Sequence, residues 1–462
     1  MFRRSREPAA ELSESGTSAK VHSGSFEQPE ASEGQDRSDD APGVSYADVL
    51  GLVGFAAASL AFLMASPMGY STVNRIWAED GPIFLSDALH GSIWENAFAA
   101  YAGYLHVPAR LVAEVIAALP VGWWAAAIAL ISALIRVGIA IVAWFATSEY
   151  LHSRYWRYAV SFVVVTLPSG SPEVLNNLAN LHWFLMFGAV LCSMWTTTTK
   201  LGLASRTLVL GAATLADPVT ALVVVILLWR AIKGRRVHEW IALGVVLACA
   251  FLQGLAVLGG SRGAVLGVDI STLFHLYSLR VLYMSATGTS LAEYLYNVGP
   301  FVVLVVVGSV LVLLARGVLV AGPQRPLVAV CTVSSLVLYS VMMAYVPVGG
   351  PLVPGDELDA GYTGRYGVTA SLLVLVAALA GWAARSNSRR QYWPLLPGFF
   401  LTVLYVWALI SASLTPIPVT QPGWDVEAAR LQSTCLSGAE SSNASVEPAP
   451  WEFSVPCQSV LR

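Results

Sequence analysis

Charged residues are scarce in this 462-residue chain, in which Asp, Glu, Lys and Arg together make up only 12% of the positions. Soluble globular domains carry about 25% charged residues, so this scarcity excludes an ordinary soluble domain. The net charge is −3 and the basic residues are scattered between apolar runs, which gives no indication of nucleic-acid binding. The sequence also lacks a glycine-rich phosphate loop, zinc-type Cys/His spacing and a G-x-S-x-G motif.

Apolar residues are abundant instead, at 56% of the chain. Repeated apolar runs near the ~20 residues that span a bilayer predict an all-α polytopic membrane protein with about eleven transmembrane helices. The basic groups between these runs fall on one side if the N-terminus is inside and the C-terminus outside. The predicted spans are 47–69, 121–146, 155–167, 182–198, 205–216, 219–232, 238–257, 299–316, 326–346, 367–384 and 394–413.

Both ends of the chain are polar. Residues 1–43 have almost no large aliphatic side chains, so we predict a disordered cytoplasmic tail. The transmembrane domain then covers 44–413, and 414–462 forms a small extracytoplasmic tail. Outside the membrane, Cys435 and Cys457 are expected to form a disulfide.

Two of the predicted spans are too short to cross a bilayer alone. The run 155–167 meets Pro168, and the run 205–216 meets Asp217 and Pro218. Irregular backbone is not tolerated against lipid, so half-length helices that end at a proline predict re-entrant hairpins with tips in a water-filled cavity. We expect these tips to lie on the outer side.

The first outer segment, residues 70–120, is too polar to span and predicts helices that lie in the membrane interface. Near its start, the motif Trp77-Ala-Glu-Asp-Gly-Pro82 places Glu79 and Asp80 side by side. Two adjacent carboxylates repel each other, which raises the pKa of at least one of them. We therefore predict that Asp80 is a catalytic base supported by Glu79. The alternative is an acidic helix N-cap.

Arginines on the outer side stand out because the orientation rule disfavours them there. Arg110 and Arg365 could each clamp a phosphate bidentately, and with His106 they form the predicted phosphate-binding group. The alternative for any one arginine near the end of a span is that its side chain reaches the lipid headgroups.

A polar stretch, Glu173-Val-Leu-Asn-Asn-Leu-Ala-Asn-Leu-His-Trp183, lies between two predicted spans. Such polarity in a membrane protein is costly without a function, and its amides could bind sugar hydroxyls beside a stacking indole. The alternative is polar contact between helices. The predicted sugar- and acceptor-binding residues are Tyr104, Glu173, Asn176, Asn180, His182 and Trp183.

Together these features resemble the GT-C superfamily of membrane glycosyltransferases, in a bacterial branch. Members carry an acidic motif in the first outer loop, followed by interfacial helices and broken hairpins around a lateral cavity. This chain matches that layout over about 47–413, through the pair Glu79-Asp80, the stretch 82–118 and the eleven predicted spans. The chain differs in having Glu-Asp-Gly where better-known branches have Asp-Glu or Asp-Asp, and it has no large soluble outer domain.

The resemblance implies an enzyme of the cytoplasmic membrane that uses a polyprenyl-phosphate-linked sugar donor. The acceptor would be an extracytoplasmic glycan, lipid or protein of the cell envelope. Arginine would neutralise the leaving phosphate while a carboxylate removes the acceptor proton, so that the anomeric centre inverts. This scheme requires no cofactor, although it leaves a divalent cation open.

Two other classes of protein fit the same sequence. A transporter or flippase would use the outer polar residues to line a pathway and the short segments as discontinuous helices. A non-catalytic cell-envelope assembly protein would use its outer tail as a contact surface. An acidic pair that faces an outer cavity with arginines opposite favours sugar transfer, whereas charges spread through the membrane depth favour transport.

Overall fold

The structure is a computed structural model that describes residues 45–65, 72–169, 174–259, 269–345, 364–384, 395–414 and 419–462. The chain divides into two units, Met1–Val49 and Leu50–Arg462, and the second contains almost all of the described residues. The predicted tail 1–43 and the predicted site residue Glu173 lie outside the described residues.

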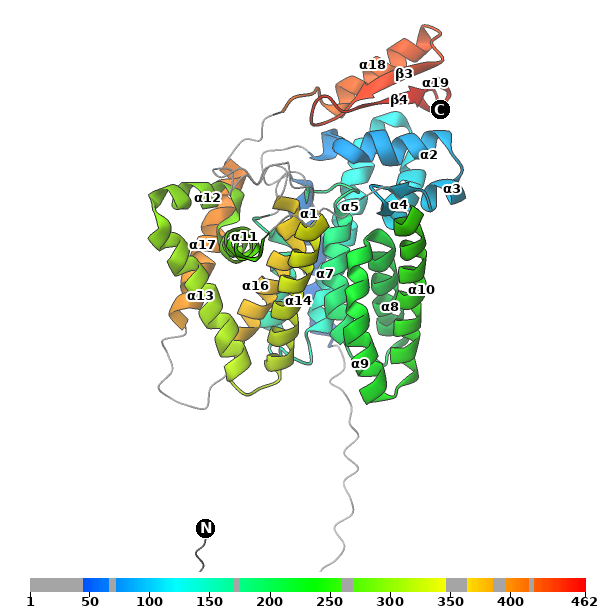
Figure 1. Ribbon diagram of the computed structural model, residues 1–462. Coiled ribbons are helices and arrows are strands. Elements are labelled where there is room, and N and C mark those ends of the chain that lie inside the picture. The colour runs from blue at the N-terminus through cyan, green and yellow to red at the C-terminus, as the bar shows by residue number, and fades with distance from the viewer. Residues whose placement is uncertain are drawn as a thin grey trace, which may run out of the picture. The chain divides into compact units, whose positions relative to one another are not determined.

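Long apolar helices dominate the second unit (Figure 1). Seven of the described helices are long and apolar enough to cross a membrane, which agrees with a helical protein embedded in a membrane. Their bounds are α1 (Tyr46–Met64), α5 (Trp124–Ala146), α10 (Val237–Gly259), α13 (Pro300–Leu319), α14 (Gln324–Tyr345), α16 (Val368–Ala383) and α17 (Leu395–Leu414).

The other four predicted spans are short or broken helices. At 1.5 Å per residue a 14-residue helix covers about 21 Å, less than the ~30 Å hydrocarbon core. The eleven predicted spans therefore correspond to seven full-length helices and four shorter segments. These segments are α6 (Arg154–Thr166), α7 (Leu181–Met194), α8 (Lys200–Ala216), and η6 (Pro218–Val223) followed by α9 (Val224–Gly234).

The short helix α7 is the centre of the packing. All of its residues are buried, and it packs against α5, α8 and α16. A helix that is apolar on every side is stable only when other elements surround it. Because protein rather than lipid covers α7, this helix does not need the length of a membrane span.

The segment between α1 and α5 forms short helices and turns, with one hairpin in which β1 pairs antiparallel with β2. The helices predicted for this segment are thus present as short elements; their location in the membrane interface stays a prediction. In order, its elements are η1 (Thr72–Asn74), η2 (Ala78–Asp80), η3 (Gly81–Leu85), α2 (Ser86–His90), α3 (Ile93–Ala97), β1 (Ala100–Tyr101), β2 (Tyr104–Leu105), α4 (Val107–Ala117) and η4 (Val121–Trp123).

Between α10 and α17 the chain adds further helices, and there α14 packs against α16 and α12 against α17. The shorter elements of this part of the chain are α11 (Ile270–Leu276), η7 (Tyr277–Tyr283), α12 (Met284–Val298) and η8 (Gly364–Gly367).

The C-terminal segment, residues 419–462, is a helix against a two-stranded sheet, and it packs on η4, α2 and η3 of the first outer segment (Figure 1). Strand β3 pairs antiparallel with β4, with Ala444 opposite Phe453. A disulfide joins Cys435 to Cys457, which confirms the predicted pair. The elements are α18 (Trp424–Leu436), β3 (Ser441–Ser445), β4 (Glu452–Pro456) and α19 (Cys457–Val460).

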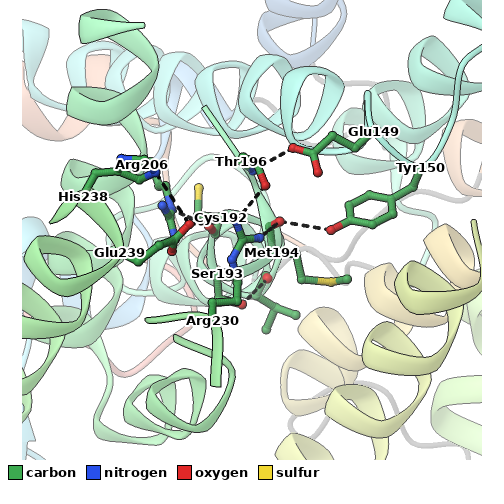
Figure 2. Close-up of polar contacts among 11 residues, drawn as sticks. Glu149, Tyr150, Cys192, Ser193, Met194, Thr196, Arg206, Arg230, His238 and Glu239 are labelled. Atoms are coloured by element: carbon green, nitrogen blue, oxygen red, sulfur yellow. Dashed lines mark hydrogen bonds and ion pairs between the residues drawn. The ribbon is translucent and has the colours of Figure 1, made fainter. Parts of the chain in front are cut away.

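A buried ionic cluster joins the C-terminal end of α7 to α8, α9 and α10 (Figure 2). Glu239 pairs with Arg206 at 2.5 Å and, through its other oxygen, with Arg230 at 2.8 Å. Arg206 also donates to the carbonyl of Cys192 at 2.9 Å, and Arg230 donates to that of Met194. Cations at a helix C-terminus stabilise the helix because they oppose its dipole.

Candidate functional site

The acidic motif lies on the short turn η2, and the residue before the carboxylates has a strained backbone. Ala78 has φ +37°, a conformation that residues with a side chain rarely adopt. Strained residues of this kind persist only where the surroundings hold them, and they cluster at functional sites. The motif therefore has a fixed conformation in which its two carboxylates meet different surroundings.

The carboxylate of Asp80 is fully buried and bound to backbone. Its Oδ2 accepts from the N–H of Leu178 at 2.9 Å, and its Oδ1 accepts from the N–H of Ala179 at 2.9 Å. Burial raises the pKa of Asp80 to about 7; the two backbone hydrogen bonds oppose this rise, and the charge of Glu79 adds to it. Asp80 thus fixes the chain just before α7 and does not line the cavity described next.

Glu79 instead faces a small cavity, which we call the polar chamber, of about 160 Å³. Its Oε1 lies 3.9 Å from a terminal nitrogen of Arg365, and its buried Oε2 has no hydrogen-bond partner among the described residues. The polar chamber is lined by Glu79, Phe84, Tyr101, Ala102, Tyr104, His106, Ala179, Asn180, His182, Trp183, Arg365 and Tyr366.

The polar chamber brings together four distant parts of the chain. Among the predicted site residues, it gathers Glu79, Tyr104, His106, Asn180, His182, Trp183 and Arg365. Prediction placed a carboxylate, a cation and sugar-binding side chains on one outer surface, and these seven side chains do line one cavity.

Two histidines form one wall of the polar chamber. Their rings are 5.8 Å apart, and the ring of His106 lies 4.4 Å from that of Tyr104. The Nδ1 of His182 is 2.6 Å from the carbonyl oxygen of Ala179, so this nitrogen carries the proton. The other nitrogen, Nε2, is then free to accept a hydrogen bond, and it lies 3.8 Å from Asp217.

Asn180 and Trp183 also line the polar chamber, and the Trp183 ring lies 4.0 Å from that of His182. The indole Nε1 of Trp183 donates to Asn180 Oδ1 at 3.0 Å, which orients both side chains. The ring of Tyr366 packs edge-on against that of Trp183 at 5.6 Å. Aromatic faces and amides are the usual components of a pocket that binds a partly polar ligand.

A second cavity of about 420 Å³, the apolar chamber, shares a wall with the polar chamber. The residues common to both are Ala102, Tyr104, Trp183 and Tyr366. Among the described residues that line it, Asp217 is the only one with a charged side chain. Its lining is Ala102, Gly103, Tyr104, Trp183, Asp217, Pro218, Val219, Ala221, Leu222, Val257, Val341, Met342 and Tyr366.

The β1–β2 hairpin provides much of the shared wall. Its turn residues Ala102 and Gly103 have φ +55° and +87°, as a tight two-residue turn requires. The buried amide of Gln253, in α10, accepts from the N–H of Leu105 at 3.0 Å and donates to its carbonyl at 3.1 Å. This pair of bonds fixes the hairpin between the two chambers.

Besides Asp80, two further predicted site residues have other roles. Arg110 does not line the polar chamber with Arg365; it donates to Asp87 at 2.6 Å. Asn176 donates to the carbonyl of Leu63 at 2.9 Å and lies in the left-handed region, with φ +50°. Both side chains therefore contribute to the scaffold around the chambers.

Several lining residues were missed as site residues. Asp217 caps η6 by accepting from the N–H of Val219 at 2.8 Å, which is the helix-capping role that a residue before proline often has. Burial raises the pKa of Asp217 to about 7, with that backbone hydrogen bond opposing the rise. The position of Asp217 directly before Pro218, at the break between α8 and η6, was the sequence signal that could have identified it as a site residue. Tyr366 could have been inferred because it directly follows the predicted Arg365. Nothing in the sequence marked Tyr101 as a site residue.

Comparisons of the chain with protein family models, curated proteins and solved structures give no match. The fold and the site together define a membrane-embedded helical protein with a polar and an apolar chamber side by side. Such a pair of chambers suits an amphipathic molecule whose polar head and apolar chain need different surroundings.

Proposed function

We propose that this protein is an integral membrane glycosyltransferase. It moves a sugar from a polyprenyl-phosphate-linked donor to an acceptor on the outer side of the cytoplasmic membrane, with inversion at the anomeric carbon. The observation that carries the proposal is the polar chamber, where Glu79 and Arg365 lie 3.9 Å apart beside an apolar chamber.

The base in this proposal is Glu79, which replaces the predicted Asp80. A general base must reach the proton that it removes, either directly or through one water. Glu79 lines the polar chamber, whereas both oxygens of Asp80 accept backbone hydrogen bonds in a fully buried position. Asp80 acts on the site indirectly, because Ala179 donates its N–H to Asp80 and accepts from His182 through its carbonyl oxygen.

The reaction needs one base and one cation. Glu79 removes the proton of the acceptor hydroxyl, whose oxygen attacks the anomeric carbon from the face opposite the phosphate. The bond between that carbon and the phosphate oxygen breaks, and the phosphate leaves with the electron pair. Arg365 stabilises the charge that develops on the phosphate, an effect that is strong in a cavity with little water. The Trp183 ring offers a stacking surface for the sugar.

The apolar chamber suits the lipid part of the donor. The phosphate would lie near the wall shared by both chambers, close to Tyr104 and Trp183. The prenyl chain would then leave through surroundings made by residues such as Val257 and Met342. Burying apolar surface there contributes about 25 cal/mol per Å² to donor binding, before the cost of association is subtracted.

The ends of the helices differ in a way that supports an outer location for the site. The Cys435–Cys457 disulfide belongs to the C-terminal segment that contacts the acidic motif, and disulfides persist in oxidising compartments. Lys233 and Arg235 lie where α9 ends, just before the first residue of α10, whereas Val257 near the last residue of α10 lines the apolar chamber. Basic residues favour the cytoplasmic side.

Release of polyprenyl phosphate from a labelled donor tests the proposal. Purified protein in lipid nanodiscs is incubated with a panel of polyprenyl-phosphate monosaccharides and a cell-envelope extract as acceptor. We expect protein-dependent release of the lipid phosphate with at least one donor, and a product of inverted anomeric configuration.

The rival transport function predicts a different result. In proteoliposomes, movement of an intact lipid-linked sugar across the bilayer without cleavage of its glycosidic bond would replace the transferase proposal. An absence of both cleavage and movement across the whole panel would favour a non-catalytic envelope protein.

A further inference from the structure

The C-terminal segment binds the backbone of the acidic motif. The N–H of Glu447 donates to the carbonyl of Ile76 at 3.1 Å, and the N–H of Ala78 donates to the carbonyl of Glu447. These bonds make a short parallel bridge between Trp77 and Glu447. Residues more than 360 positions apart in the sequence are therefore joined beside the candidate base.

The side chain of Glu447 reinforces this bridge. Its carboxylate is buried and pairs with Arg75 at 3.0 Å. It also accepts from the hydroxyl of Thr420 at 2.6 Å and from the N–H of Gln421 at 2.6 Å. One carboxylate thus connects Arg75, just before the motif, to the start of the C-terminal segment. These bonds are strong because charge-assisted hydrogen bonds are stronger than neutral ones.

A second contact holds the other end of the motif. A Cβ atom built at Gly81 would lie 2.8 Å from the ring of Phe453, so only glycine allows β4 to approach so closely. Glu79 lies between the bridged Ala78 and the covered Gly81. The segment therefore constrains the backbone on both sides of the carboxylate that faces the polar chamber.

The C-terminal segment is itself anchored independently of the motif. The indole N–H of Trp424 donates to the carbonyl of Val121 at 2.8 Å, and its ring stacks on that of Trp124 at 6.0 Å. The disulfide between Cys435 and Cys457 joins α18 to α19. A rigid element can hold a strained neighbour in place, and the φ of +37° at Ala78 marks such strain.

We propose that residues 419–462 are a positioning element for Glu79, and that Glu447 is its positioning residue. The inference rests on the proposed function for the role of Glu79 as a base, but the contact itself does not. Without the Glu447 carboxylate the bridge loosens, so that the backbone at Ala78 relaxes to an ordinary conformation and Glu79 turns from the polar chamber toward solvent.

A thiol at the candidate base reports this position directly. Glu79→Cys is placed in a chain with Cys249→Ser, because the other unpaired cysteines, Cys192 and Cys331, are buried. The rate of reaction with a small water-soluble methanethiosulfonate is then measured in nanodiscs. Adding Glu447→Ala is expected to speed the reaction roughly tenfold, as local opening exposes the thiol.

The controls separate positioning from loss of structure. Glu452→Ala removes an exposed carboxylate from the same hairpin and should leave the rate unchanged. A thiol at exposed Ser92, in the same outer segment, should react at one rate with or without Glu447→Ala. If the Ser92→Cys reaction also accelerates, Glu447 merely supports the fold and the inference is overturned. Phe453→Leu provides a second test if Glu447→Ala does not fold.

In the chain that keeps Glu79, Glu447→Ala should lower kcat for sugar transfer about tenfold and leave the KM for the donor within twofold, because only the base is displaced. An unchanged labelling rate with both Glu447→Ala and Phe453→Leu would overturn the inference whatever the protein's activity. A changed rate in a protein that transfers no sugar would leave the positioning contact standing and remove the glycosyltransferase proposal.

Discussion

The two ends of the buried helix α7 carry polar clusters of opposite kinds. At its C-terminal end, both carboxylate oxygens of Glu239 pair with arginines, and these arginines also bind helix carbonyls (Figure 2). At its N-terminal end, His182 and Trp183 line a cavity where Glu79 has a buried oxygen without a hydrogen-bond partner among the described residues.

The difference separates a structural cluster from a candidate site. Buried polar atoms are almost always hydrogen-bonded, and each exception needs an explanation. At the Glu239 cluster both carboxylate oxygens are already paired with arginines, so this carboxylate offers little to a ligand, although Arg206 Nη1 has no hydrogen-bond partner among the described residues. The Glu79–Arg365 pair is looser, at 3.9 Å, and it borders empty volume. Both side chains therefore border space that a bound molecule could fill.

The largest expected effect is a loss of enzymatic activity when the cluster at the N-terminal end of α7 is altered. Glu79→Gln keeps the size and polarity of the side chain but removes the base, so sugar transfer should fall by about 10²–10⁴-fold. The matched control is Glu95→Gln, an exposed glutamate of α3, which should transfer sugar at the normal rate. Both are measured as release of polyprenyl phosphate from the donor. Normal activity in Glu79→Gln would remove Glu79 from the mechanism.

The second effect is on stability. Glu239→Ala leaves the buried Arg206 and the half-buried Arg230 without their carboxylate partner, and breaking a buried ion pair typically costs about 3–5 kcal/mol. The free energy of unfolding in detergent should fall by that amount, while Glu79→Gln changes it little. A loss below 1 kcal/mol in Glu239→Ala would mean that the ionic cluster is not structural, and the contrast between the two ends of α7 would fail.

Apolar runs in the sequence predicted the helical architecture because hydrophobic segments of membrane length have few alternatives. The same runs marked 155–167 and 205–216 as too short to cross alone, but they did not show that 182–198 is not a full span. The segment around α7 reads as a span from composition alone, yet the helix has 14 residues, all of them buried. Whether lipid or protein surrounds an apolar helix depends on its neighbours, and those are set by the tertiary fold.

The site could be predicted in its residue types but less well in its geometry. The tract that ends at Trp183 and the motif containing Glu79 were recognisable because polarity in a membrane protein is costly. The direction of each side chain was not recognisable. Asp80 turns toward the Leu178 and Ala179 amides, and Arg110 turns toward Asp87, because local backbone conformation decides where neighbouring side chains point.

The third expected effect is on the affinity of the protein for the phosphate of the donor. Arg365→Lys keeps the charge but loses the planar fork, so binding of a polyprenyl monophosphate should weaken roughly tenfold, or about 1.4 kcal/mol. Arg110→Lys is the control, because Arg110 pairs with Asp87 and does not line the polar chamber. Quenching of tryptophan fluorescence in nanodiscs measures the binding. Equal weakening in both variants would return Arg110 to the phosphate site.

The last expected effect comes from Asp80 and concerns pH. Burial raises the pKa of its carboxyl from 3.8 to about 7, so between these values the folded protein binds a proton that the unfolded chain releases. The stability that this proton provides is fully present below pH 3.8 and is lost as the pH rises through 7. Wild-type protein should therefore gain stability when the pH is lowered from 8 toward 5.

Asp80→Asn tests this assignment because an amide does not titrate in this range. The amide oxygen can accept from only one of the two N–H groups of Leu178 and Ala179 at full strength, and its NH₂ group faces the other. One buried donor without a partner costs roughly 1–3 kcal/mol, but this cost does not depend on pH. The gain in stability between pH 8 and pH 5 should thus be smaller in Asp80→Asn than in the wild type. An identical pH dependence in both would show that Asp80 ionises normally, and its role in fixing the start of α7 would then rest on its hydrogen bonds alone.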